Sequence, residues 1–253
     1  MVAQVQVKAG RYIYAIVDAL EATGSYGPIG IEGGEVYAVP EGQVAAVVSN
    51  VPDEKIRPER RHLAAHHNVE KRLMERGTPL PVSFGMIADG PEALRTILAT
   101  NQAAFVDQLR RVSGRVEMSL RVVWDVPNIF EYFVRTHPEL RRLRDQLFGG
   151  GREPSEDDKI ELGRLFDRML NEDRADHTQG VVEALAPLCV EMKENPPRTE
   201  REVVHLACLV PRDGQERFEQ GVFEAAKRFN DDYSFDFNGP WPPYNFVDVS
   251  LRT

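Results

Sequence analysis

Residues 116–124, VEMSLRVVW, predict a β-strand that opens the second half of the chain, because valine and tryptophan favour strands and apolar residues fill most of the stretch. Beyond it, the apolar spacing predicts helices over 127–147 and from Ser155, a strand over 203–210, a helix over 215–229 and an alternating strand over 233–238. Helices between strands favour α/β or α+β packing, with helices that cover one face of a small sheet. The order strand, helices, strand, helix, strand therefore predicts a ferredoxin-like domain.

The first half of the chain places several strands before its helices. The spacing predicts a strand over 11–17, a hairpin of strands 36–39 and 44–49, a helix over 59–76, a short strand over 82–86 and a helix from about Pro91 to Gly114. We expect two α+β domains with mixed or antiparallel sheets, over 1–114 and 115–238, and a tail over 239–253 that packs on the body. Gly149-Gly150-Gly151 predicts a mobile loop in the second domain.

The C-terminal segment Asn238-Gly239-Pro240-Trp241-Pro242-Pro243-Tyr244-Asn245-Phe246 cannot form a helix or a central strand. Each proline fixes φ and lacks an N–H donor, so the segment runs extended or turned. Its rings either fill the last part of the core or form a surface that receives a partner, and both can hold at once. The segment has no titratable side chain except a tyrosine hydroxyl, which favours packing or recognition over chemistry.

The strongest pattern for an enzyme is His62, His66 and Glu70, spaced to lie along one face of the first long helix. Two histidines and a carboxylate could bind zinc, which would make the chain a metal-dependent small-molecule enzyme. The HExxH motif is absent, however, and Val69 and Leu73 share the stripe, which favours a packed, hydrogen-bonded His66. We therefore expect no enzyme activity, no catalytic residues, no metal and no other cofactor.

Composition is that of a soluble globular protein, with 42% hydrophobic and 28% charged residues. The net charge of −9 argues against binding to nucleic acid, which needs a basic face. No apolar run approaches the ~18 residues of a membrane span, and the first residues lack the pattern of a signal peptide. We expect a cytoplasmic protein that binds neither nucleic acid nor a membrane.

Five stretches of the chain, in order, resemble the gas vesicle protein F/L family, whose members are accessory proteins of a gas-filled flotation organelle. They are Arg11–Val17, Arg60–His66, Leu80–Gly85, Val116–Asp125 and the C-terminal segment Asn238–Phe246. The similarity spans nearly the whole chain, and His67 departs from the family pattern. The resemblance implies two α+β domains, the second a modified ferredoxin-like fold.

The resemblance also implies a function in gas vesicle organisation. A family member is expected to be a minor structural component or assembly factor that binds the small hydrophobic shell protein GvpA, or other accessory proteins, and works at the gas-facing surface. An acidic soluble partner could shield the apolar surface of a free shell subunit. The contact elements expected are an open sheet edge and the aromatic C-terminal segment. We name Trp241, Tyr244 and Phe246 as partner-binding residues, with Tyr12 and Tyr14 as a second choice.

Overall fold

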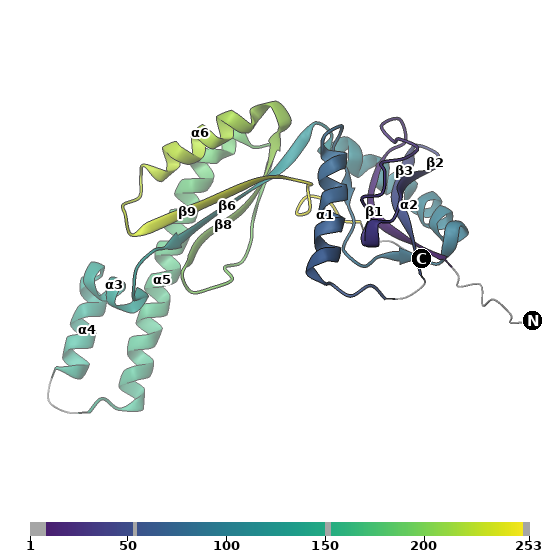
Figure 1. The fold of residues 1–253 in the computed structure, drawn as a ribbon. Helices are drawn as coiled ribbons and strands as arrows, with labels where there is room; N and C mark the ends of the chain where they lie inside the picture. Colours follow the sequence, from purple (N-terminus) through teal and green to yellow (C-terminus); the bar gives the residue numbers. More distant parts are fainter. Residues whose placement is uncertain (1–8, 53–54, 150–152, 250–253) are drawn as a thin grey trace, which may run out of the picture. The chain divides into compact units, whose positions relative to one another are not determined.

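The computed structural model describes residues 9–52, 55–149 and 153–249 (Figure 1). They form two compact units, one within 1–117 and 239–253 and the other within 118–238. The two boundaries fall inside strands β6 (Arg115–Trp124) and β9 (Tyr233–Trp241). Each unit combines helices with its own sheet, which confirms the predicted α+β class.

The first unit is built on an antiparallel sheet. Its strands are β1 (Ala9–Asp18), β2 (Val36–Glu41), β3 (Val44–Pro52), β4 (Leu80–Pro81) and β5 (Ile87–Ala88). They run in the order β2-β3-β1-β4, and β5 also pairs with β1. Gly42 makes the predicted β2–β3 turn, and its φ of 60° suits a residue without Cβ. The register sets Tyr12 opposite Ser49, which brings two buried hydroxyl-bearing side chains to neighbouring positions.

Two helices and a short 3-10 turn complete this unit: α1 (Arg60–Met74), α2 (Gly90–Val112) and η1 (Ile31–Gly33). Val69 and Leu73 of α1 pack into the apolar cluster that contains Tyr12 and Tyr14 of β1. The buried side of α1 is not wholly apolar, because His62, His66 and Glu70 also lie on it. A helix face of this composition requires polar partners within the core.

The second unit holds a sheet in the order β7-β8-β6-β9. Its further elements are α3 (Ile129–Thr136), α4 (Pro138–Phe148), α5 (Glu156–Leu185), β7 (Glu191–Glu194), β8 (Glu202–Pro211) and α6 (Gln215–Ala226). Helices α5 and α6 pack on β8 and on each other, whereas α3 and α4 pack along α5 beyond the sheet (Figure 1). The strand order confirms a ferredoxin-like unit, modified by the two extra helices before α5.

Some local predictions need correction. Residues 82–86 form a turn between β4 and β5, where Gly85 has a φ of 90°, and not a strand. Strand β7 was not predicted, because its four residues are mostly charged. Strand β9 continues past Asn238, since a proline such as Pro240 is tolerated at the edge of a sheet. Of the predicted mobile loop, Gly150 and Gly151 lie outside the described residues. None of the described helices has the length and apolar character needed to cross a membrane.

Candidate partner-binding site in the C-terminal tail

Residues 239–249, here called the tail, begin with the last three residues of β9, Gly239–Trp241, and then turn sharply. The Tyr244 N–H donates to the Pro242 carbonyl at 2.7 Å, and the Phe246 N–H donates to the Pro243 carbonyl at 3.0 Å. The two prolines are themselves buried. The tail is therefore an ordered, turned segment, as its prolines predict.

Three contacts fix the tail to the first unit. Phe246 is only 1% exposed. The Asn245 main-chain N–H and side-chain amide donate to the two oxygens of Glu117, at 2.7 and 2.6 Å. Further on, Gln108 of α2 exchanges two hydrogen bonds with the Asp248 main chain, at 2.7 and 2.6 Å. An apolar anchor combined with paired hydrogen bonds holds the tail in one position.

A chain of buried polar groups joins the tail to β1 through α1. The Tyr244 hydroxyl donates to the Glu70 carboxylate, within hydrogen-bond distance of both oxygens. The His67 Nδ1 lies 3.2 Å from Glu70 Oε2. The His66 Nε2 lies 3.3 Å from Glu70 Oε1, but without hydrogen-bond geometry. On its other side, His66 Nδ1 is 2.9 Å from the Tyr12 hydroxyl.

A main-chain donor also reaches this chain at Tyr12. The Gly85 N–H donates to the Tyr12 oxygen at 3.2 Å, and the same oxygen lies 2.9 Å from His66 Nδ1. The order Tyr–His–Glu is that of a nucleophile, base and orienting acid. Because Tyr12 and His66 are 0% and 2% exposed, however, the chain is placed to hold structure and not to meet a substrate.

Burial keeps the hydroxyls of the site protonated. It raises the pKa of Tyr12 and of Tyr14. The pKa of Tyr244 is also raised, first by burial and then by the neighbouring Glu70 carboxylate. All three phenols therefore remain neutral hydrogen-bond donors over the physiological pH range, so the bond between the tail and α1 persists.

The structure separates the five predicted partner-binding residues into two groups. The Trp241 and Tyr244 residues are 47% and 39% exposed. Phe246, Tyr12 and Tyr14 are buried; the Tyr14 hydroxyl, for example, contacts Ser49 Oγ and accepts from the Ile31 N–H, both at 2.8 Å. Two of the rings are thus accessible to solvent, whereas the other three belong to the buried interior.

Sequence reasoning missed Glu117 and Asn245. A signal existed for the first of them, because Glu117 lies between the apolar Val116 and Met118 of β6, and it is 5% exposed. An acidic residue at a buried strand position indicates a specific partner, though not which one.

The proposed zinc ligands do not converge on one point. The His62 Nδ1 contacts the Arg57 carbonyl at 2.9 Å and its Nε2 contacts Glu32 at 2.7 Å, whereas His66 and Glu70 turn to Tyr12 and Tyr244. Among the residues that the structure describes, no group of three or more His, Cys, Asp or Glu side chains is placed to hold a metal ion. The helical spacing places the three residues along one face of α1, but each of them forms hydrogen bonds with a different set of partners.

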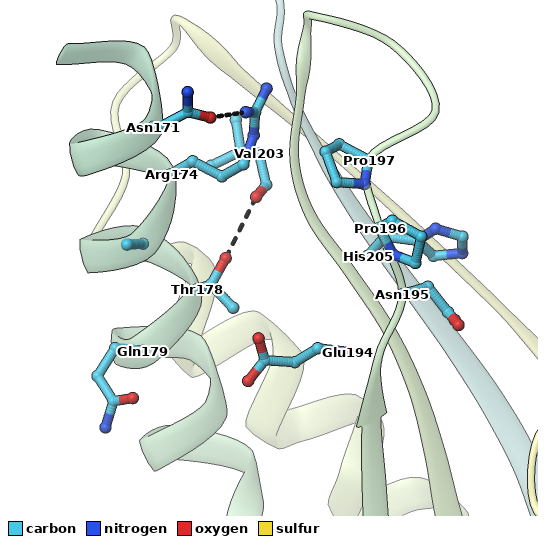
Figure 2. A pocket seen from close by; sticks show the side chains of 11 residues that line it. Asn171, Arg174, Thr178, Gln179, Glu194, Asn195, Pro196, Pro197, Val203 and His205 are labelled. Atoms are coloured by element: carbon cyan, nitrogen blue, oxygen red, sulfur yellow. Dashed lines mark hydrogen bonds between the residues drawn. The ribbon is translucent and has the colours of Figure 1, made fainter. Parts of the chain in front are cut away.

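A cleft of about 510 Å³ lies in the second unit between α5 and the segment that follows β7 (Figure 2). Its arginine, Arg174, donates to the Glu202 and Glu200 carbonyls and to Asn171, so the guanidinium is engaged by the protein itself. Thr178 donates to the Val203 carbonyl. Both of these groups are engaged by the protein itself, whereas the Nδ1 of His205, on the same lining, is buried without a hydrogen-bond partner among the described residues. The tail, which exposes two aromatic rings, remains the better candidate for a partner-binding site.

Comparisons with known proteins agree with this organisation. A family model described as gas vesicle synthesis protein GvpL/GvpF matches residues 10–248. The chain is 27% identical to gas vesicle protein F of Nostoc sp., over 96% of this chain and 100% of that protein. It is 27% identical to gas vesicle protein F of Streptomyces sp., over 94% and 99%. The crystal structure of the gas vesicle protein GvpF from Anabaena sp. matches with a TM-score of 0.84 and 26% identity, over 96% of this chain and 99% of that one. The matches span both units and the tail, which confirms the resemblance seen in the sequence.

Proposed function

Because the chain belongs to the GvpL/GvpF family of gas vesicle proteins, we propose that it is a minor structural and assembly protein of the gas vesicle. In this role it binds the hydrophobic shell protein GvpA and assists vesicle formation. Other gas vesicle accessory proteins are further partners. The protein acts in the cytoplasm and remains associated with the vesicle, at its gas-facing surface.

The observation that carries this proposal is the aromatic pair of the tail. The Trp241 and Tyr244 rings are partly exposed on a segment that Phe246, Glu117 and Glu70 hold in place. Exposed tryptophan and tyrosine are the side chains that most often dominate the energy of protein interfaces. Since the tail is already ordered, binding does not cost the entropy of ordering it.

Charge supports the same role. A free subunit of a hydrophobic shell protein exposes apolar surface that favours uncontrolled association. A bound partner with a net charge of −9 would keep the complex soluble, because like-charged complexes repel one another. Shielding of apolar surface by an acidic, folded partner requires no catalytic group, which fits the structural use of His66 and Glu70.

The test is co-expression of the chain with GvpA, followed by purification of the complex and measurement of its affinity. We expect a soluble complex that Trp241→Ala weakens roughly thirtyfold or more, the effect of losing a hot-spot aromatic. Phe148→Ala is the matched control, because Phe148 on α4 is 45% exposed, similar to Trp241, but lies in the second unit.

Two outcomes would count against the proposal. A folded Trp241→Ala variant that binds GvpA as tightly as the parent chain removes Trp241 from the contact. A folded parent chain that fails to bind GvpA but co-purifies with sister accessory proteins overturns shell binding, and makes the chain a scaffold among accessory proteins.

A further inference from the structure

Strand β9 is the exposed end of the ferredoxin-like sheet. It follows β6 in the strand order, and among the described residues no other strand pairs with its outer side. The side chains along β9 alternate in exposure. Ser234 and Asp236 are exposed, whereas Tyr233, Phe235 and Phe237 are half-buried. An outer strand of this kind offers main-chain donors and acceptors to an added strand.

The other sheet ends are less suited to strand addition. The β2 edge carries Pro40, which has no N–H, and a bridge between Gly27 and Val36 covers its beginning. Strand β7 has only four residues, Glu191–Glu194. Strand β9 has its own proline, Pro240, but only near its end, so within the described residues the stretch 233–239 is the longest proline-free run on an outer strand of the two sheets.

A row of three aromatic side chains follows β9. Tyr233 and Phe235 each lie 5.0 Å from the ring of Phe229, and Phe237 lies 5.9 Å from that of Phe218, measured between ring centroids. Unlike Phe218, which is buried, Tyr233, Phe235 and Phe237 remain half-exposed at the sheet margin. Apolar side chains of a neighbouring strand would remove this aromatic area from water.

The charge beside this row is negative. Asp231 and Asp236 are exposed, and within the described residues neither pairs with a lysine or arginine. Antiparallel pairing of β9 with a second copy of itself, in a register centred on residues 235–237, would set Asp236 opposite or diagonal to its own counterpart. Like charges at such positions destabilise a strand pair, so the edge disfavours a second copy and favours a basic strand.

We propose that the outer edge of β9 is a docking site for an extended segment of another protein, apolar at alternate positions and carrying lysine or arginine between them. The segment adds to the sheet as a further strand. Its apolar side chains cover Tyr233, Phe235 and Phe237, and its basic side chains face Asp236. The site is contiguous with the tail, since Trp241 is the last residue of β9, but its test uses residues 233–237 and a peptide in place of GvpA, so the two proposals fail independently.

The experiment uses the full chain and a short capped peptide that alternates lysine and valine. We expect hydrogen–deuterium exchange to show new amide protection within β9 and none within β2. A peptide methylated on its main-chain nitrogens should lose binding, because strand addition depends on main-chain hydrogen bonds. The charge-reversed peptide, with glutamate in place of lysine, should bind more weakly.

Charge reversal on the protein sharpens the test. Asp236→Lys should weaken binding of the lysine peptide about fivefold and strengthen binding of the glutamate peptide, since cross-strand charge pairs have this magnitude. Asp107→Lys, a change at another exposed aspartate, on α2, is the control and should leave both affinities unaltered.

Three results would overturn the proposal. One is equal binding of the methylated and unmethylated peptides. Another is protection that appears away from β9. The third is concentration-dependent dimerisation of the chain alone, seen by sedimentation velocity, with protection of β9, which would make a second copy the occupant.

Discussion

The two units bury their aromatic side chains in different surroundings. In the first, the hydroxyls of Tyr12 and Tyr14 lie in the core and each meets a polar partner. In the second, Phe133 packs edge-on against Trp124 and Phe166, with ring centroids 5.3 and 5.5 Å apart. Packing of the second kind depends mainly on apolar area and volume, whereas packing of the first kind depends on single donors and acceptors.

This difference shows which unit can report on the state of the tail. The polar core of the first unit includes Glu70, whose carboxylate accepts from the Tyr244 hydroxyl, so loss of the tail removes one donor from a buried carboxylate. The aromatic core of the second unit includes no residue of the tail. Variants in the two cores should therefore differ in how much they lower the free energy of unfolding and also in whether they affect the tail.

The largest effect is expected for Phe133→Ala in the aromatic core. Phe133 is fully buried, and truncation should lower the free energy of unfolding by about 3–5 kcal/mol through lost burial and a cavity. Urea unfolding followed by the fluorescence of buried Trp124 measures it. Phe130, a half-buried neighbour that also packs on Phe166, is the control. Similar losses for Phe133→Ala and Phe130→Ala would contradict the dependence on buried area.

A smaller but more selective effect is expected for Tyr244→Phe in the polar core. The change keeps the ring and removes one oxygen, so it should cost about 1.5–3 kcal/mol, the range for hydrogen bonds to charged groups. Tyr37→Phe removes the hydroxyl that donates to Asn50 in an exposed bond and should cost much less. Tail amides near Phe246 should also exchange faster in Tyr244→Phe. Unchanged exchange there, with the ring retained, would show that Glu70 does not hold the tail.

The aromatic core was easier to predict from the sequence than the polar one. Apolar spacing identified the strand that ends at Trp124, and the helix predicted from Ser155 begins there with a capping box formed by Ser155 and Asp158. Such signals are local, since they arise from the period of one strand or the first turn of one helix.

The polar core depends on partners far apart in the chain. Tyr244 and Glu70 are 174 positions apart, and Asn245 and Glu117 are 128 apart. Helical spacing placed His66 and Glu70 on one face but could not show that Tyr12 and Tyr244 would meet them there. The aromatic tail was recognisable as a packed segment, because its prolines and rings are local, whereas its acceptors were not.

The smallest effect on stability is expected for His62, in the first turn of α1. Here a polar contact of the first unit can be tested by changing the pH. Both ring nitrogens of His62 face acceptors, the Arg57 carbonyl and the Glu32 carboxylate, which requires an imidazolium. The bond to Arg57 first, and that to Glu32 next, raise the pKa of His62. The bond to His62 first, and the charge of Arg61 next, lower the pKa of Glu32.

The linkage between protonation and folding gives the direction in which stability changes with pH. The stabilisation from His62 is complete below its unfolded pKa of ~6.5 and is lost as pH rises through the higher folded value. That from Glu32 is present above its unfolded pKa of ~4.3 and is lost as pH falls through the lower folded value. The parent chain should therefore melt at a higher temperature than His62→Gln. This difference in melting temperature should be largest between pH ~4.3 and pH ~6.5, the two unfolded pKa values, and should become smaller toward alkaline pH. A difference in melting temperature that stays constant from pH 6 to pH 9 would mean that His62 is neutral. In that case His62 donates a hydrogen bond to only one of its two acceptors.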